Sequence, residues 1–263
     1  MHDKTHPSFV PPENENARIW RYMDYPKFIS LLDKRGLFFA KVMAFADPYE
    51  GTIPKHNQTE SHHEDGNIPL HDVVEAELKR RRPIALINSW HINEYESAAM
   101  WDLYSKRNAG IAIQSTYRRL SKSLDTNNED TVYIGKVAYI DFDSEWIGAE
   151  NIYQPFLTKR KSFEHEQELR AITDLPSSDP GYIVNGRGFS VGQSFVAPDR
   201  KPINRSTPTV LGKYVSVDLE VLIERIHVAP QAPDYLYEGI TSVAEKFGVD
   251  KMHFLKSDLY SLK

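Results

Sequence analysis

The chain has no cysteine among its 263 residues. Without thiols it can form no disulfide, no cysteine nucleophile and no thiolate-ligated zinc site. It also lacks any run of about 20 apolar residues, the length that a membrane-spanning helix needs. Residues 1–16 are polar and interrupted by proline, with no apolar stretch typical of a signal peptide. We therefore expect a cytoplasmic protein without a membrane partner, with residues 1–16 forming a flexible N-terminal segment.

An excess of positive charge is also missing. Lysine and arginine number 32 against 37 aspartates and glutamates, which gives a formal net charge of −5. Broad binding of nucleic acid relies on excess positive charge, so net charge does not indicate nucleic acid as a partner. Two basic runs, Lys79–Arg82 and Lys159–Lys161, could each contact a phosphate, but we interpret both as solvated helix ends.

Apolar residues make up 40% of the chain and aromatic residues 11%, enough for a sizeable core. The length is near the upper limit for one core, and we expect a single domain over residues 1–263. Two stretches interrupt it: a polar loop over residues 52–72 and a surface insertion rich in proline, serine and glycine over residues 175–211. Gly186 and Gly188 within the insertion lack the third glycine of a dinucleotide-binding fingerprint, because Val191 occupies that position.

Short apolar runs alternate irregularly with amphipathic segments over the rest of the chain. Strands are predicted over 19–23, 37–42, 84–90, 110–116, 131–141, 214–217, 225–228 and 251–255, with another following the acidic residues after 163. Helices are predicted over 26–35, 73–82, 96–104, 117–124, 151–161, 219–224 and 234–247. This order favours an α+β fold with a mixed, largely antiparallel central sheet and flanking helices.

Histidines are concentrated in the polar loop, where His56, His62, His63 and His71 lie among acidic residues. Imidazole and carboxylate are common zinc ligands. No two of these histidines have the one-turn helical spacing that would direct both rings at one ion. We therefore interpret the segment as a surface loop and expect no structural metal.

Three short segments combine charge, aromatic rings and turn-forming residues: Trp20–Tyr22, the turn Ala46–Gly51, and Glu166–Arg170. A fourth, Glu96–Tyr104, reads as a helix on whose one face Ser97, Trp101 and Tyr104 recur. We predict that the chemically capable residues of these segments, together with Trp90, converge on one cleft. They are Arg21, Tyr22, Asp47, Glu50, Trp90, Trp101, Glu166, Glu168 and Arg170, with Ser97 and Tyr104 as further pocket candidates.

These segments, with Leu37–Phe39 and Gly110–Ile113 between them, resemble the uncharacterised bacterial family numbered 2971 among the domains of unknown function, over roughly residues 19–230. More distantly, the layout is similar to the ADP-ribosyltransferase fold. That similarity implies an enzyme of a defence or stress system that transfers ADP-ribose from NAD to a macromolecular or small-molecule acceptor. It also implies three sites: Arg21 on an early strand, a hydroxyl of Ser115 or Thr116 on a middle strand, and the catalytic pair Glu166 and Glu168 before a late strand.

In the transferase interpretation Arg21 binds the phosphates or ribose and belongs with the catalytic residues, while Tyr22, Trp101 and Arg170 help to bind NAD. A carboxylate under the ribose would stabilise the oxocarbenium-like cation formed when the nicotinamide bond breaks.

Three other interpretations remain open. Glu166, Glu168 and Arg170 could form exposed ion pairs on one face of a strand, with little effect on stability. A metal-dependent nuclease would instead gather Asp47, Glu50, Glu166 and Glu168 around magnesium, with Lys161 or Arg170 near the scissile phosphate. A non-catalytic sensor or partner-binding module would present an exposed apolar patch.

Overall fold

The computed structural model describes residues 3, 6–59, 70–105, 109–125, 130–148, 152–175 and 211–261. These residues form an α+β fold with a mixed, mostly antiparallel nine-stranded sheet, which confirms the predicted fold class. A short parallel pair of strands lies apart from the main sheet. The strands are β1 (Arg18–Asp24), β2 (Gly36–Lys41), β3 (Ala85–Ile92), β4 (Gly110–Thr116), β5 (Tyr133–Lys136), β6 (Ala138–Ile140), β7 (Thr158–Arg160), β8 (Glu168–Asp174), β9 (Gly212–Ser216), β10 (Arg225–Val228) and β11 (Phe254–Lys256).

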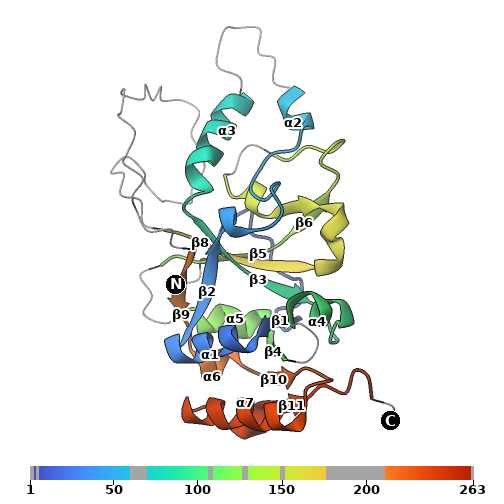
Figure 1. The fold of residues 1–263 in the computed structure, drawn as a ribbon. Coiled ribbons are helices and arrows are strands. Elements are labelled where there is room, and N and C mark those ends of the chain that lie inside the picture. Colours follow the sequence, from blue (N-terminus) through green and yellow to red (C-terminus); the bar gives the residue numbers. More distant parts are fainter. Residues whose placement is uncertain are drawn as a thin grey trace.

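Helices lie at both ends of this sheet. Figure 1 shows α2 and α3 at one end and α1, α5, α6 and α7 at the other, with α4 beside the sheet. The helices are α1 (Tyr25–Lys34), α2 (His56–Thr59), α3 (Leu70–Arg81), α4 (Ala98–Ser105), α5 (Tyr117–Ser123), α6 (Leu219–Leu222) and α7 (Asp234–Lys246), with 3₁₀ turns at Val42–Ala44, Gln154–Phe156, Lys161–Glu166 and Lys251–His253.

Strand β3 is the centre of the sheet because it pairs with three others. β8 pairs with β3 along Ala85–His91 and so occupies one edge of it. β1 and β2 share the other edge, with Trp20 opposite His91 and Ala40 opposite Ile87. The sheet therefore forks along this edge, and the arm led by β1 continues through β4, β10 and β11.

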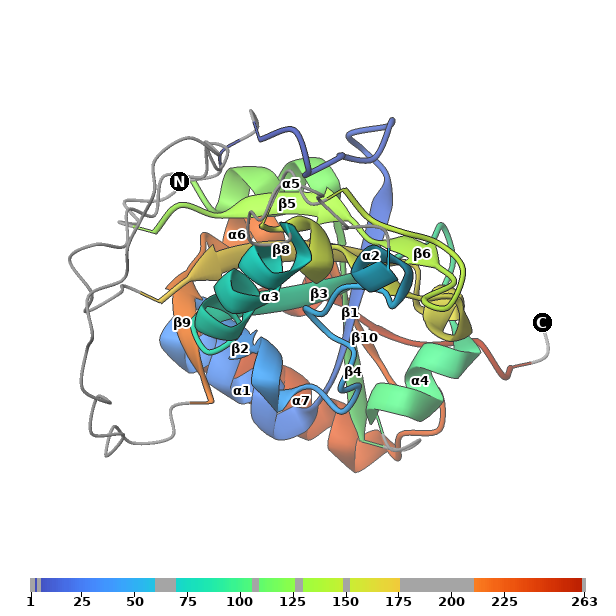
Figure 2. The same ribbon diagram turned by 90° about the horizontal axis from the view of Figure 1, so that it is seen from above.

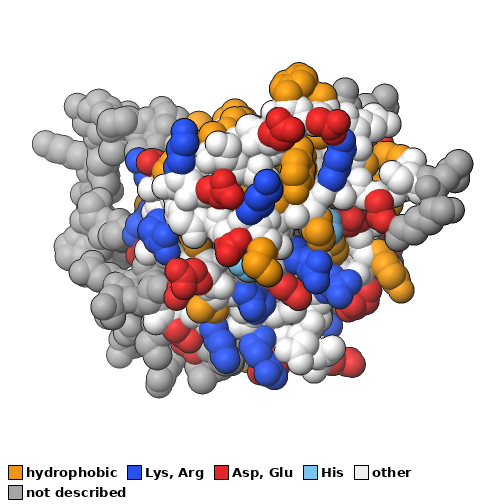
Figure 3. Space-filling view, turned by 90° about the horizontal axis from the view of Figure 1, so that it is seen from below, with side chains coloured by type: hydrophobic (Ala, Val, Ile, Leu, Met, Phe, Trp, Pro, Cys, Tyr) orange, Lys and Arg blue, Asp and Glu red, His pale blue; other side chains and the backbone are white. Residues whose placement is uncertain are grey.

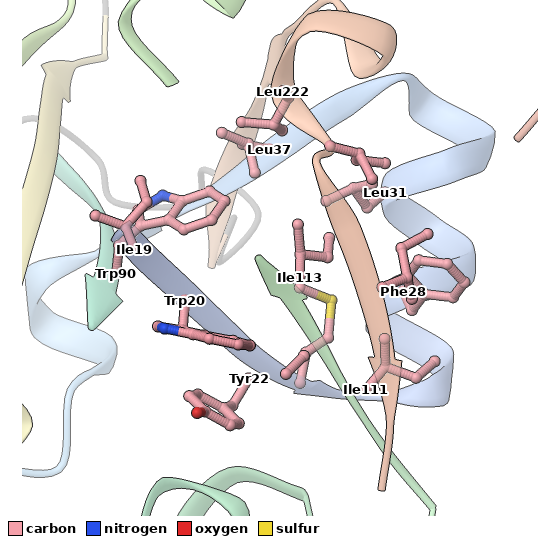
Figure 4. Close-up of a cluster of buried hydrophobic side chains, with 14 of the residues drawn as sticks. Ile19, Trp20, Tyr22, Phe28, Leu31, Leu37, Trp90, Ile111, Ile113 and Leu222 are labelled. Carbon is pink, nitrogen blue, oxygen red and sulfur yellow. The ribbon is translucent and has the colours of Figure 1, made fainter. Parts of the chain in front are cut away.

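The core lies in two layers because side chains alternate along β3. Leu86 and Trp90 belong to the larger hydrophobic cluster, shown in part in Figure 4, together with Phe28 of α1. Ala85 and Ile87 belong to a smaller cluster on the opposite face of β3. Leu78 of α3 packs into the smaller cluster, and Figure 2 shows α3 on the side of β3 and β8.

Helix α1 covers the predicted range to within one residue at either end. Asp24 caps it by accepting a hydrogen bond from the amide of Lys27 at 2.9 Å, and proline occupies its first turn. Glycine is the commonest left-handed residue after a helix, but here Arg35 takes that conformation, with φ of 43°. Gly36 instead begins β2, where an added Cβ would lie 3.0 Å from the carbonyl oxygen of Val215. The glycine is therefore needed for close approach of β9.

Three predicted elements differ from the structure. The strand over 251–255 is a 3₁₀ turn at Lys251–His253, and only from Phe254 does it continue as β11. The helix over 151–161 is a 3₁₀ turn at Gln154–Phe156 followed by β7, and the strand over 131–141 is divided into β5 and β6. β5 pairs with β8, whereas β6 leaves the main sheet to pair with β7. Tertiary pairing thus overrides the local pattern. For the same reason the basic run from Lys159 is not a solvated helix end.

The expected loops are only partly described. Within residues 1–16, Phe9 is buried and stacks on Tyr133 with ring centroids 5.0 Å apart, so this part of the expected flexible segment packs on the fold. The expected polar loop contains α2 and the start of α3, while residues 60–69 lie outside the described residues. The expected insertion is likewise outside them, except for its first and last residues, 175 and 211.

The surface has no single sign of charge on the face that Figure 3 shows, where acidic and basic side chains are intermixed. Among the described helices, none is long and apolar enough to cross a membrane.

The turn that ends at Gly51 requires glycine at this position, and a substitution tests this. Its φ is +68°, and an added Cβ would lie 2.5 Å from a ring carbon of the fully buried Phe156. Left-handed strain and overpacking together should make Gly51→Ala cost roughly 2–4 kcal/mol of unfolding free energy. Chemical denaturation measures this, with Gly239→Ala in α7 as the control, since nothing lies within 4 Å of its added Cβ. The control should be neutral or stabilising, and equal effects of the two changes would contradict the assignment.

Candidate functional site

Five charged side chains meet in the interior on one face of β8, and we call them the carboxylate cluster: Glu50, Lys159, Glu166, Glu168 and Arg170. Each of the five residues is at most 7% exposed. Glu168 and Arg170 share a face because they alternate on β8, opposite His91 and Ser89 of β3. The other three come from the turn before residue 51, from β7 and from the 3₁₀ turn that precedes β8. The alternative interpretation, in which Glu166, Glu168 and Arg170 form exposed ion pairs, is wrong because all three are buried.

Arg170 joins two of the carboxylates. Its Nη1 and Nη2 each donate to one carboxylate oxygen of Glu50 at 2.8 Å, which is the bidentate geometry of a strong pair. Its Nε donates to Glu168 at 2.7 Å, and Nη1 also donates to the carbonyl of Phe156 at 2.8 Å. Burial alone would lower the pKa of Arg170, but Glu168 and Glu50 outweigh it and raise that pKa above its ordinary value.

Lys159 joins all three carboxylates. Its Nζ donates to Glu168 at 2.7 Å and to Glu166 at 3.0 Å, and it lies 3.5 Å from an oxygen of Glu50. The hydroxyl of Tyr104 on α4 donates to the other side of the group, to Glu166 at 3.3 Å. Tyr104 is 43% exposed. Tyr104 therefore connects the buried cluster to the protein surface.

The two glutamates face the same lysine because of the residue between them. Gln167 has a φ of 38°, a left-handed conformation that only a few per cent of non-glycine residues adopt. Its backbone is held on both sides: its amide donates to Glu164, and its carbonyl accepts from Ile92 at 2.9 Å. The conformation reverses the chain locally, so that Glu166 at the end of the 3₁₀ turn and Glu168 at the start of β8 both reach Lys159.

The two glutamates differ electrostatically. Burial raises the pKa of Glu168, but contacts with Arg170 and Lys159 outweigh it and hold that pKa well below its ordinary range. Burial and the neighbouring carboxylate of Glu168 raise the pKa of Glu166 above its ordinary value. With three carboxylates and two cations, the ionised cluster has one negative charge in excess. That excess is least compensated at Glu166.

A half-exposed arginine stands beside the cluster. Arg160 donates to both carboxylate oxygens of Asp47, at 2.9 and 3.4 Å. Its guanidinium carbon also lies 4.3 Å from the ring centroid of Tyr49 and 5.3 Å from that of Phe163. Asp47 is thus joined to the site through Arg160 and, along the same turn, through Glu50.

Aromatic residues and a histidine extend the same sheet face away from the cluster. His91 Nδ1 lies 2.7 Å from the carbonyl oxygen of Glu166, and its ring is next to Tyr22, 6.4 Å between centroids. Burial lowers the pKa of His91. The Tyr22 hydroxyl accepts from the amide of Ser97 at 2.9 Å, and the Tyr22 ring packs edge-to-face on Trp101. These contacts fix α4, and with it Tyr104, over the sheet.

A second set of hydrogen-bonded polar side chains lies at the other end of this face. Glu96 accepts from the indole of Trp101 at 3.0 Å and lies 3.1 Å from Nδ1 of His227. The other ring nitrogen of His227 is 3.2 Å from Oε1 of Gln114. Ser97 begins α4, since its hydroxyl accepts from the amide of Met100. All of these polar groups have partners, so they serve to hold α4 in place.

Four of the predicted site residues lie elsewhere. Arg21 forms no ion pair with a described residue: its guanidinium donates to the carbonyl of Ser89 at 2.5 Å and lies 5.9 Å from the centroid of Trp90, whose indole donates to Asn88. Burial lowers the pKa of Arg21 to about 10. Ser115 donates to the carbonyl of Leu222 at 2.5 Å, and Thr116 caps α5.

The cluster thus contains Glu50, Glu166, Glu168 and Arg170 of the predicted set, with Tyr104 bonded to it and Asp47 beside it. Sequence reasoning missed Lys159, Arg160 and His91 as site residues. A signal for Lys159 existed: it lies two residues after the apolar pair Phe156–Leu157, as a residue of a buried strand would.

No group of three or more histidine, aspartate or glutamate side chains is placed to hold a metal ion in the part of the chain that the structure describes. Lys159 and Arg170 occupy the space between the carboxylates that a magnesium ion would need. Of the four histidines of the polar loop, His62 and His63 lie outside the described residues. The chain matches no protein-family model, no curated protein and no solved structure.

Proposed function

We propose that the carboxylate cluster is the active site of an enzyme that breaks the glycosidic bond between nicotinamide and ribose in NAD, in the manner of an ADP-ribosyltransferase. The observation that carries this proposal is the position of Glu166: of the two cations of the cluster only Lys159 contacts it, and it accepts from the half-exposed Tyr104. Enzymes place perturbed carboxylates of this kind where a reaction develops charge.

The chemistry follows from the sign of that charge. The nicotinamide ring of NAD is cationic, and the ribosyl group becomes cationic as the bond breaks. A buried site with one unbalanced carboxylate favours both, since electrostatic stabilisation is strongest where water is excluded. Glu168 has a different role in this proposal, because Arg170 and Lys159 already neutralise it. It fixes Lys159, which in turn orients Glu166.

A cation that could bind the phosphates of NAD lies next to the cluster. Arg160 is half-exposed, adjoins Lys159 in β7, and lies between two aromatic rings. A guanidinium in such a position suits bidentate binding of a phosphate. We therefore assign the phosphate-binding role to Arg160 instead of Arg21. The guanidinium of Arg21 donates to the carbonyl of Ser89 and lies over the ring of Trp90.

The test is nicotinamide release from NAD by the whole chain, with protein and nucleic-acid acceptors present, together with NAD titration by calorimetry. Release that needs no divalent metal supports the proposal. Cleavage of nucleic acid that requires magnesium, with NAD inert, would favour a nuclease instead. If the protein neither binds NAD nor cleaves either substrate, the site is non-catalytic and the resemblance to transferases is misleading.

A further inference from the structure

A concave site lies beside the carboxylate cluster, on the same turn that holds Glu50. A cavity of about 450 Å³ is lined by the turn around Tyr49 and Gly51, by α3 and by residues 142 and 143. Its size is within the usual range of small-molecule sites. α3 and α2 stand at this end of the sheet in Figures 1 and 2.

The cavity lining has one positive charge in excess. Lys55, Lys79 and Arg82 line it against only two acids. Lys55 pairs with Asp143 at 2.9 Å and Lys79 pairs with Glu75 at 3.3 Å, and all four side chains are at least 47% exposed. Pairs this exposed contribute little to stability, so an anionic ligand can replace the acidic partner at small cost.

Arg82 is the cation whose lack of partners indicates a ligand site. It forms no ion pair within the described residues, and its Nε is buried without a hydrogen-bond partner there. Its Nη2 makes one long contact, 3.4 Å to the carbonyl of Pro48. A buried, unsatisfied donor on a charged group is costly, because it has lost water and gained nothing in exchange. The guanidinium end of Arg82, by contrast, lines the cavity and has only the one long contact to Pro48, so an acceptor that enters the cavity would pair with it.

Aromatic rings supply the other half of the recognition. Tyr49 and Phe142 both line the cavity and pack edge-to-face with centroids 5.7 Å apart. Ring faces near arginine and lysine suit a ligand that carries both a flat base and a phosphate.

We propose that this cavity binds a nucleoside monophosphate, with the phosphate at Arg82 and the base against Phe142 and Tyr49. The proposal does not depend on the activity of the carboxylate cluster, which uses other residues. Because Tyr49 also stacks on Arg160, the bound nucleotide would contact the turn that holds Asp47 and Glu50.

Calorimetric titration with AMP, GMP, CMP and UMP, and with adenosine and inorganic phosphate alone, tests this site. We expect at least one nucleotide to bind more tightly than either of its parts. Arg82→Gln should weaken that binding by about tenfold or more, since a charge-assisted pair is lost. Arg80→Gln, an exposed change two residues earlier in the last turn of α3, should leave it unaltered.

A second variant separates binding from folding. Phe142→Leu keeps an apolar side chain but removes the ring, and should weaken nucleotide binding without altering the weaker binding of inorganic phosphate. Thermal melts of all variants show whether each remains folded. The proposal is overturned if no nucleotide binds the wild-type chain, or if folded Arg82→Gln and Phe142→Leu both bind as the wild type does.

Discussion

Glu168→Gln is expected to lower the free energy of unfolding by about 3–5 kcal/mol, because it removes one charge from a buried, hydrogen-bonded ion-pair network. The residue is 5% exposed and accepts from both Lys159 and Arg170. Glutamine has nearly the same size, so the loss arises from charge and not from packing. Arg170 keeps Glu50 as a partner, whereas Lys159 is left with weaker contacts.

Urea denaturation at pH 7 measures this effect, and Glu164→Gln is the matched control because Glu164 is exposed on the adjoining turn. The control should change stability by no more than about 0.5 kcal/mol. The pH dependence gives a second check. Since the folded-state pKa of Glu168 lies below its ordinary value, its contribution is present above pH of about 4 and is lost as pH falls through the folded-state pKa. The difference between wild type and variant should therefore shrink in acid, and a constant difference would contradict the ionic explanation.

Several strands of the main sheet follow from the sequence because their apolar residues are dense and their ends are marked. β1, β4 and β10 each cover their predicted ranges to within one residue at either end. Alternation along β8 also placed Glu168 and Arg170 on one face. These features are local, so a local pattern is sufficient to predict them.

The burial of the cluster could not be predicted in the same way. Whether a Glu-x-Glu-x-Arg segment is exposed depends on which distant residues cover it, here Glu50, 120 positions from Arg170, and Lys159 from a strand that reads as a helix. The position of Arg21 could not be predicted either, because it depends on the fork in the sheet. With β1 and β2 sharing one edge of β3, the guanidinium reaches the carbonyl of Ser89 instead of the acidic residues.

The left-handed residue between the two glutamates has no sequence signal either. Gln167 is neither glycine nor asparagine, and its conformation depends on hydrogen bonds with Glu164 and Ile92 that form only in the complete fold. Residues held in such conformations are found preferentially at functional sites. This gives a further physical reason to look for the reacting carboxylate at Glu166 or Glu168.

Glu166→Gln is expected to lower activity strongly and stability weakly, whereas Glu168→Gln is expected to lower stability strongly. Under the proposed function, the change removes the charge that balances the ribosyl cation, and nicotinamide release should fall by about 10²–10³-fold. NAD binding should survive, because glutamine retains the size and an acceptor oxygen. Calorimetry for binding and single-turnover kinetics for the chemical step distinguish the two effects.

Stability should respond weakly and with a characteristic pH dependence. Since the folded-state pKa of Glu166 is raised, the folded protein binds the proton more tightly than the unfolded chain does, and stability falls as pH rises from the unfolded pKa through the folded one. Glu166→Gln removes this slope, so the variant should lose less stability at neutral pH than Glu168→Gln, although it too loses a contact with Lys159. Glu164→Gln again serves as control and should keep full turnover. A Glu166→Gln protein that folds, binds NAD and releases nicotinamide at the wild-type rate would show that this carboxylate does not act in the reaction.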